Sequence, residues 1–323
     1  MRRFQVLSLA RTDVRLIPIL ALALATWIAL PISSEAKVVS QVIDLPVKVL
    51  DAQGKSVEHA IKVTIVRDDA RPKSPFLILN HGRGKNREVH GRTSVSPYLD
   101  NARYFVSKGY AVFMPLRMGY GATAGPDLEN SGICAAKNYP PGYEAGAQQT
   151  VAVIAYARQL AFIDADNGLV VGQSYGGTIA IAMASKGAAG VKAVINFAGG
   201  GGGNPDERPE RPCGIDRLTA LFAGYGVNAR IPTLWLYSAN DKFWGPQLPR
   251  DWFQAFIDRG GKGQFIELPP YKENGHPSFT GNPQVWQPHV ERFLATCCTV
   301  QRSDLQDKPV LRPPQDVRAL RKH

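Results

Sequence analysis

The stretch from residue 167 to residue 185 limits the possible folds more than any other part of the sequence. A short apolar run, Leu-Val-Val, ends at Gly172, and a helix rich in alanine is expected from Thr178 to Ser185. The residues between them are Gly-Gln-Ser-Tyr-Gly-Gly, so a strand must turn into a helix within very few residues. A side chain at Gly172 or Gly176 would clash across such a turn, which accounts for glycine at both positions.

The rest of the chain repeats this alternation of strands and helices. Buried strands are expected at 76–79, 110–115, 167–172, 191–197, 232–238 and 264–268. Helices are expected at 97–108, 144–160, 178–185, 248–259 and 285–295. Residues 38–66 alternate apolar and polar side chains around a turn at 51–54, without a helix, so they should form an antiparallel hairpin at one sheet edge. The expected fold class is α/β, with a mainly parallel central sheet, helices on both faces and an antiparallel N-terminal edge.

Three regions are expected along the chain. Residues 1–36 resemble a signal peptide, because four arginines accompany the apolar run 16–30 and small residues permit cleavage after Ala36. The alternative is a retained membrane anchor, but this run is shorter than the roughly twenty residues that span a bilayer. Residues 37–299 should form the folded domain, with lid-like excursions at 125–142 and 199–230. Residues 300–323 are expected to form a poorly ordered basic tail, and the exported protein would be periplasmic or secreted.

Composition and charge narrow the classes of partner. The chain has 323 residues, of which 44% are hydrophobic, so it can bury a large core without a metal or disulfide framework. Its formal net charge is +11, but the basic residues do not cluster with aromatic ones. We therefore expect no nucleic-acid partner and no stable membrane span after signal cleavage. The charge favours solubility, or a loose preference for anionic surfaces or substrates.

The sequence contains four cysteines: Cys134, Cys213, Cys297 and Cys298. They form no zinc signature and no Cys-x-x-Cys motif, so no metal site is expected from them. Export would bring them into an oxidising compartment, where disulfides form. Because Cys134 and Cys213 both fall in loops expected above the sheet edge that carries Ser174, we predict that these two pair.

Ser174 has the context of a nucleophile elbow, Gly-x-Ser-x-Gly between a strand and a helix. A serine hydroxyl is a weak nucleophile unless a base takes its proton and an acid orients that base. Asp241 follows an expected strand and His276 follows the last one, which gives the chain order serine, acid, histidine. The alternative role of Asp241 is to cap a turn. His276 is preferred as the base, since His289 lies in the final helix and His323 ends the sequence.

The segment His81-Gly82-Arg83-Gly84 follows the expected strand 76–79. An elbow serine needs two backbone donors for the negative charge that develops on the substrate oxygen. The first is the N–H of Tyr175, and the second is expected from this earlier loop, at the N–H of Arg83. His81 is then structural. The competing interpretation makes His81 a base, but it precedes the serine in the chain.

Together these motifs resemble the α/β-hydrolase superfamily over residues 38–296. The resemblance is closest to the dienelactone-hydrolase-like and prolyl-oligopeptidase-like branch. Members of that branch share a His-Gly oxyanion strand, an Arg-x-Gly-x-Gly loop such as the one at 117–121, and a Ser-Asp-His triad. Ser174 stands where true dienelactone hydrolases have cysteine, so that activity is not expected. No β-propeller precedes the domain, which argues against a size-filtered oligopeptidase.

The resemblance implies acyl transfer to water, with a small-molecule carboxylic ester as the expected substrate and no cofactor. Phe243 and Trp244 follow the predicted acid and either line an acyl or alcohol pocket or pack at the sheet edge. Arg117 and Tyr120 are further candidates for contact with a polar substrate group. Two alternatives stay open: an exported peptidase or amidase that uses the same triad, and a non-catalytic binding protein on a hydrolase scaffold. The sequence gives no indication of oligomeric state.

Overall fold

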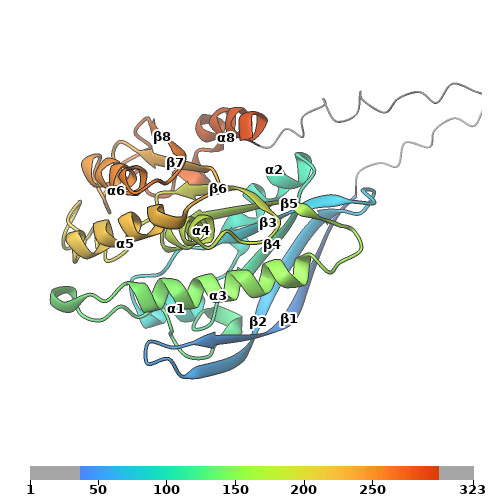
Figure 1. The fold of residues 1–323 in the computed structure, drawn as a ribbon, viewed down its shortest axis with the longest axis horizontal. Coiled ribbons are helices and arrows are strands. Elements are labelled where there is room, and N and C mark those ends of the chain that lie inside the picture. The colour runs from blue at the N-terminus through green and yellow to red at the C-terminus, as the bar shows by residue number, and fades with distance from the viewer. Residues whose placement is uncertain (1–36, 298–323) are drawn as a thin grey trace, which may run out of the picture. The chain divides into compact units, whose positions relative to one another are not determined.

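The centre of the molecule is one eight-stranded sheet in the computed structural model, which describes residues 37–297. The strands are β1 Val38–Leu50, β2 Ser56–Asp68, β3 Ser74–Asn80, β4 Ala111–Leu116, β5 Ile163–Gln173, β6 Val191–Phe197, β7 Thr233–Ser238 and β8 Gly263–Leu268. Their order across the sheet is β1-β2-β4-β3-β5-β6-β7-β8 (Figure 1). The first two strands pair antiparallel, β2 also runs antiparallel to β4, and all other pairs are parallel. The predicted α/β fold with an antiparallel N-terminal edge is confirmed.

The hairpin of β1 and β2 is joined by the turn expected at 51–54. The side chain of Asp51 accepts hydrogen bonds from the backbone N–H groups of Gln53 and Lys55, each at 2.9 Å. Gly54 has a φ of +77°, a conformation that glycine adopts without strain. Local turn chemistry of this kind fixes the register of the two strands.

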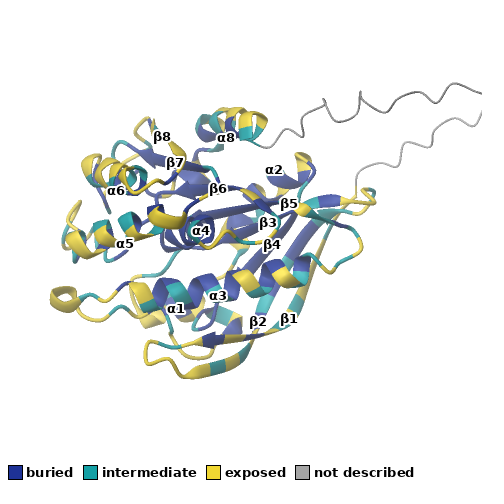
Figure 2. Cartoon of the chain, viewed as in Figure 1, coloured by how far each residue is buried: buried dark blue, intermediate teal, exposed yellow. Residues whose placement is uncertain are grey.

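Helices cover both faces of the sheet (Figure 1). They are α1 Arg87–Arg92, α2 Leu99–Ser107, α3 Pro140–Ala157, α4 Tyr175–Lys186, α5 Ile215–Asn228, α6 Gln247–Asp258, α7 Ser278–Gly281 and α8 Pro283–Cys297. Apolar side chains from α3, α4, α5 and α6 pack in one core, and those from α2, α7 and α8 in a second core. Figure 2 shows the central strands of the sheet as buried, whereas the edge strand β1 carries many exposed residues and the exposed residues of the helices are turned outward.

The central strands feed both cores, because successive side chains of a strand point to opposite faces. In β3, Phe76 and Ile78 belong to the core on one face, and Leu77 and Leu79 to the core on the other. All four side chains are at most 2% exposed. Burial on both faces explains why the sequence shows a continuous apolar run here rather than an alternating pattern.

Several helices differ from the sequence prediction, and the short helices α1 and α7 were not expected at all. Helix α3 begins at Pro140, four residues before the predicted start, with prolines in its first turn where no N–H partner is needed. Within the segment 199–230, for which the sequence showed no clean period, residues 215–228 form α5. The apolar stripe of α5 buries Leu218 and Phe222 at helical spacing. Gly224 and Gly226 lower the helix propensity of this stretch and obscured the pattern.

Some predictions concern residues outside the described part of the chain. These are the signal peptide at 1–36 with its cleavage after Ala36, the basic tail at 300–323, and the two residues Cys298 and His323. Within residues 37–297, none of the helices has the length and apolar character needed to cross a bilayer.

A disulfide links Cys134 to Cys213, as predicted. Cys134 opens a short helical turn at 134–136, and Cys213 lies just before α5. The bond therefore joins two loops that are 79 residues apart in sequence. The Tyr139 hydroxyl donates a hydrogen bond to the carbonyl oxygen of Cys213, which ties the same two loops together a second time.

Replacing both cysteines, Cys134→Ser with Cys213→Ser, should lower the free energy of unfolding by about 2–4 kcal/mol, because the unfolded chain gains conformational freedom. Denaturant titration of the two proteins measures the difference. A reducing agent should shift the midpoint of the wild type far more than that of the variant. Equal stability of the two proteins would contradict a structural role for this disulfide.

Candidate active site

The residues singled out in the sequence meet at one edge of the sheet. Strands β3 to β8 are parallel, so their carboxyl ends lie on the same side. Ser174 follows β5, Asp241 follows β7 and His276 lies in the loop after β8. The loop that begins at His81 follows β3 and meets them at this edge. Loops at the carboxyl ends of parallel strands are the usual place for a site in an α/β fold.

Ser174 occupies a strained turn between β5 and α4. Its φ is +58° and its ψ is −124°, a backbone conformation that residues other than glycine rarely adopt. A Cβ at Gly172 would collide with the carbonyl oxygen of Gly176, and a Cβ at Gly176 with the carbonyl oxygens of Asn80 and His81. The turn therefore needs both glycines, and it holds the serine hydroxyl at the start of α4.

A chain of hydrogen bonds joins the three side chains. The Nδ1 atom of His276 lies 2.8 Å from Oδ2 of Asp241, and Nε2 lies 3.0 Å from Oγ of Ser174. Asp241 is completely buried, and its other carboxylate oxygen accepts the backbone N–H of Phe243 at 2.8 Å. An acceptor-only carboxylate on Nδ1 places the imidazole proton there and leaves Nε2 free to accept a proton from serine.

His276 is held from several sides. The ring of Phe243 stacks on its imidazole at a centroid distance of 3.9 Å, and the ring of Trp244 meets it edge-on at 5.6 Å. The side chain of Asn274 accepts the backbone N–H of His276 at 3.1 Å. Packing and hydrogen bonds together keep the imidazole between serine and aspartate.

The loop after β3 runs directly beside the serine. A Cβ on Gly82 would lie 3.2 Å from Cβ of Ser174, so only a glycine lets the backbone come this close without displacement. The backbone N–H groups of Arg83 and Tyr175 donate no hydrogen bond to any described residue. Both groups are therefore available to an oxygen bound next to the serine.

A second hydrogen-bond chain connects this loop to the histidine loop. The N–H of Gly82 donates to the Tyr98 hydroxyl at 3.1 Å, and that hydroxyl donates to the Gln173 side chain at 2.7 Å. The amide nitrogen of Gln173 donates in turn to the carbonyl oxygen of His276 at 3.3 Å. Sequence reasoning missed both Tyr98 and Gln173. The variable position before an elbow serine was the only available signal, and it does not specify a residue type.

His81 is a buried structural residue. Its Nε2 accepts the backbone N–H of Arg117 at 3.2 Å, and its Nδ1 donates to the carbonyl oxygen of Gly82 at 2.6 Å. Burial and the positive charge of Arg117 lower the pKa of His81 well below its usual value. The neutral ring thus holds the β3 and β4 loops together and does not reach the serine.

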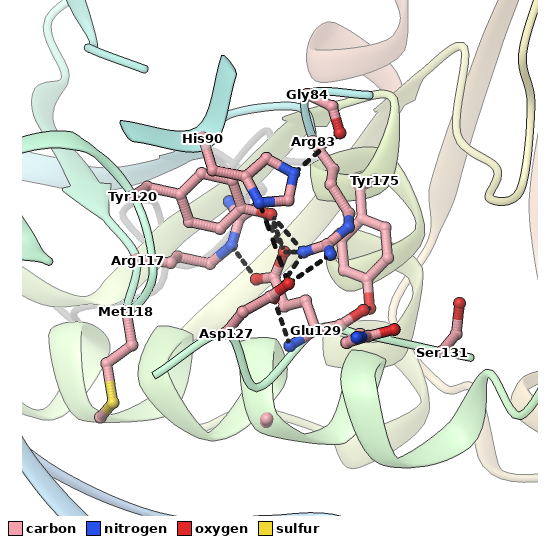
Figure 3. Close-up of polar contacts among 12 residues, drawn as sticks. Arg83, Gly84, His90, Arg117, Met118, Tyr120, Asp127, Glu129, Ser131 and Tyr175 are labelled. Carbon is pink, nitrogen blue, oxygen red and sulfur yellow. Dashed lines mark hydrogen bonds and ion pairs between the residues drawn. The ribbon is translucent and has the colours of Figure 1, made fainter. Parts of the chain in front are cut away.

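Arg117 and Tyr120, the predicted contacts for a polar substrate group, are instead engaged with groups of the protein itself. Both are fully buried, and both bind the carboxylate of Glu129 (Figure 3). Arg117 forms an ion pair with Glu129, and the Tyr120 hydroxyl donates to Glu129 at 2.6 Å. Arg117 also donates to the carbonyl oxygen of His81 at 2.9 Å. The sequence could not reveal this use, because Glu129 lies in an irregular loop without a periodic pattern.

Arg83 lies above this buried pair. Its guanidinium donates to the Tyr120 hydroxyl at 2.9 Å and to both carboxylate oxygens of Asp127, at 2.7 and 2.6 Å (Figure 3). Burial alone would raise the pKa of Asp127, but the bonds from Arg83 lower it below its usual value. The side chain of Arg83 is thus held in place by Tyr120 and Asp127.

A cavity of about 630 Å³ opens in front of Ser174. Its walls include Tyr175, the glycine-rich segment 200–203, both disulfide cysteines, and the predicted pocket residues Phe243 and Trp244. Glycine is needed at 200 and 203, because a Cβ atom at either position would collide with the ring of Trp244. This volume suits a small-molecule ligand.

Residues 77–312 match the model of a family described as the alpha/beta hydrolase family. The chain belongs to the α/β-hydrolase family. The predicted resemblance is thereby confirmed, and the serine elbow lies inside the matched range. A comparison of the sequence with curated proteins found no significant match.

Solved structures with the same fold include hydrolases of different kinds. One is named as a dienelactone hydrolase from Klebsiella pneumoniae, with 17% identity, a TM-score of 0.51, and coverage of 79% of this chain and 98% of that one. An acetyl xylan esterase from Paenibacillus sp. R4 has 14% identity, a TM-score of 0.52, and coverage of 81% and 89%. An acylaminoacyl peptidase from Pyrococcus horikoshii has 14% identity, a TM-score of 0.54, and coverage of 79% and only 41%. Similarity at this level establishes the fold and leaves the substrate to the chemistry of the site.

The buried pair of Arg117 and Glu129 gives a stability prediction. Glu129→Gln should lower the free energy of unfolding by about 3–5 kcal/mol, because it leaves a buried guanidinium without a counter-charge. Chemical denaturation measures the loss. The control is Glu88→Gln, which breaks an exposed pair with Arg92 and should change stability little. Similar effects of the two substitutions would contradict the buried role of Glu129.

His81 predicts a pH dependence of stability. Its folded pKa lies below the unfolded value of about 6.5, so below that pH the unfolded chain takes up a proton that the folded chain does not. As the pH falls from 6.5 toward the folded pKa, His81 therefore lowers the free energy of unfolding by up to about 1.4 kcal/mol per pH unit. Chemical denaturation of the wild type and of His81→Gln at pH values from about 7 to 5 measures this effect. The free energy of unfolding should fall less steeply with decreasing pH in the variant. Parallel declines would exclude His81 as a source of acid sensitivity.

Proposed function

We propose that this protein is a serine hydrolase that cleaves a carboxylic ester through an acyl-enzyme intermediate. The observation that carries the proposal is the continuous hydrogen-bond chain from Asp241 through His276 to Ser174. The serine also stands on a strained elbow, where its hydroxyl is presented at the end of β5. These are the requirements for an activated serine nucleophile.

In the first half of the reaction, Oγ of Ser174 attacks the ester carbonyl carbon while its proton passes to Nε2 of His276. The carbonyl electron pair moves onto oxygen, which the N–H groups of Arg83 and Tyr175 stabilise. Asp241 holds the imidazole and stabilises its positive charge. Collapse of this intermediate breaks the ester C–O bond, and the departing alcohol takes the proton from His276.

In the second half, water attacks the acyl-serine and gives one proton to His276. The tetrahedral intermediate collapses, the C–Oγ bond breaks, and the proton returns to Ser174. The products are a carboxylic acid and free enzyme, so the cycle needs no cofactor. An ester is favoured over an amide because an alcoholate leaves more readily than an amine, which needs fuller proton delivery from the histidine.

We also propose that the protein acts outside the cytoplasm. The disulfide between Cys134 and Cys213 supports this, since such bonds persist in oxidising compartments. The signal-like segment 1–36 is consistent with the same location and lies outside the described residues.

The central test is the reactivity of Ser174. A fluorophosphonate probe should label the purified wild type, and Ser174→Ala should lose the label together with ester turnover, by about 10⁴-fold or more. Hydrolysis of nitrophenyl esters and of aminoacyl nitroanilides measures the activity. Ser185→Ala, in the same helix but at its far end, is the matched control and should keep both.

Three outcomes would change the proposal. An unlabelled wild type would exclude an activated serine. Label that persists in Ser174→Ala would move the nucleophile to another residue. Faster turnover of the nitroanilide than of the ester would replace the esterase by an amidase or peptidase.

A further inference from the structure

The cavity in front of Ser174 carries an excess of positive charge. Four cationic side chains line it, and Asp206 is the only acidic residue among its lining residues. The cations are Arg83, Lys85, Lys137 and Arg208. A wall of this composition attracts anions and repels cations.

Two of these cations have their charge compensated. Arg83 forms two hydrogen bonds with the carboxylate of Asp127, at 2.7 and 2.6 Å. Lys85 forms an ion pair with Asp206 at 3.0 Å. Their charges are therefore largely neutralised by residues of the protein itself.

The other two cations have no carboxylate partner among residues 37–297. Lys137 donates only to neutral oxygens, the Ser131 hydroxyl at 3.3 Å and the Gly132 carbonyl at 2.5 Å. Arg208 forms no ion pair with any described residue, and its buried Nε has no hydrogen-bond partner there. A buried guanidinium N–H without an acceptor is costly, so a partner from outside the chain would stabilise it.

Arg208 and Lys137 also repel each other. Burial lowers the pKa of Lys137, and the nearby charges of Arg83 and Arg208 lower it further. The two residues lie on loops that the disulfide joins, Lys137 three residues after Cys134 and Arg208 five residues before Cys213. The disulfide thus holds two like charges at the cavity, an arrangement that a bound anion would stabilise.

We propose that this cavity binds esters that carry a carboxylate or similar small anionic group, and that Arg208 recognises this group. The inference rests on the proposed hydrolase activity of Ser174. The guanidinium offers a planar pair of donors that fits a carboxylate, and Lys137 adds a second positive charge beside it. Arg208 is then a specificity residue, since the ester bond itself is handled by Ser174 and His276.

The test compares esters matched in size and differing in charge. A nitrophenyl monoester of glutaric acid is paired with nitrophenyl valerate to place the charge on the acyl side. The acid 4-acetoxybenzoate is paired with its methyl ester to place the charge on the alcohol side. In at least one pair the wild type should show a kcat/KM about tenfold or more higher for the anionic ester, and salt should weaken the preference.

Arg208→Gln should remove this preference, so that the ratio of kcat/KM for the anionic ester to that for the neutral ester falls to about one. Arg208→Lys should retain part of it, because the charge stays and the paired donors are lost. The matched control is Arg211→Gln, an exposed arginine three residues further along that does not line the cavity. Equal turnover of charged and neutral esters, or a preference that survives Arg208→Gln, would overturn the inference.

A binding measurement separates this inference from the proposed function. Ser174→Ala, which cannot form the acyl-enzyme, is titrated calorimetrically with monomethyl glutarate and with methyl valerate. Tighter binding of the anion that disappears with Arg208→Gln supports the anion site even if no ester is hydrolysed. Ser174-dependent turnover of neutral esters without any anion preference would leave the hydrolase proposal standing and refute the anion site.

Discussion

Close approach of backbone to backbone around Ser174 is the constraint on which the rest of this site depends. The carbonyl oxygens of Asn80 and His81 press against Gly176, and Gly82 lies against the serine itself. Because Gly82 and Gly176 have no side chain, the ends of β3 and β5 approach each other more closely here than they could with a Cβ atom at either position. The strained conformation of Ser174 persists because neighbouring strands of the sheet enforce it, and these central strands are buried on both faces.

Electrostatics support this backbone arrangement from below. The buried pair of Arg117 and Glu129 reaches the carbonyl oxygen of His81, and Tyr120 extends the same network to Arg83. Burial alone would lower the pKa of Arg117, but Glu129 and Tyr120 outweigh it and raise the pKa, so the guanidinium stays charged. Charge is thus fully compensated beneath the loop and only partly compensated in the cavity above it. This contrast separates side chains that maintain the fold from side chains that face the cavity.

The sequence predicts the fold and the meeting of Ser174, Asp241 and His276 because both follow from topology. Parallel strands place their carboxyl ends on one edge, so residues that follow different strands come together whatever the intervening chain does. The sequence does not predict the role of a residue that depends on burial by segments distant in the chain. From the sequence, Arg117 and Tyr120 resemble exposed loop residues. In the structure both are buried and bind Glu129, which lies twelve and nine positions further along the chain. Helix α5 was missed because its glycines conceal the apolar stripe that packing against α4 and α6 makes stable.

The cross-link between Cys134 and Cys213 also makes the cavity sensitive to the surroundings in which the chain folds. Both cysteines belong to the cavity wall, and each lies on a loop that carries one of the two uncompensated cations. Reduction would remove one of the two ties between these loops and leave the hydrogen bond from Tyr139 to the Cys213 carbonyl oxygen as the other. If Arg208 and Lys137 form the proposed anion site, oxidation of this cysteine pair would therefore bear on the selectivity of the pocket and leave the backbone turn at Ser174 unchanged.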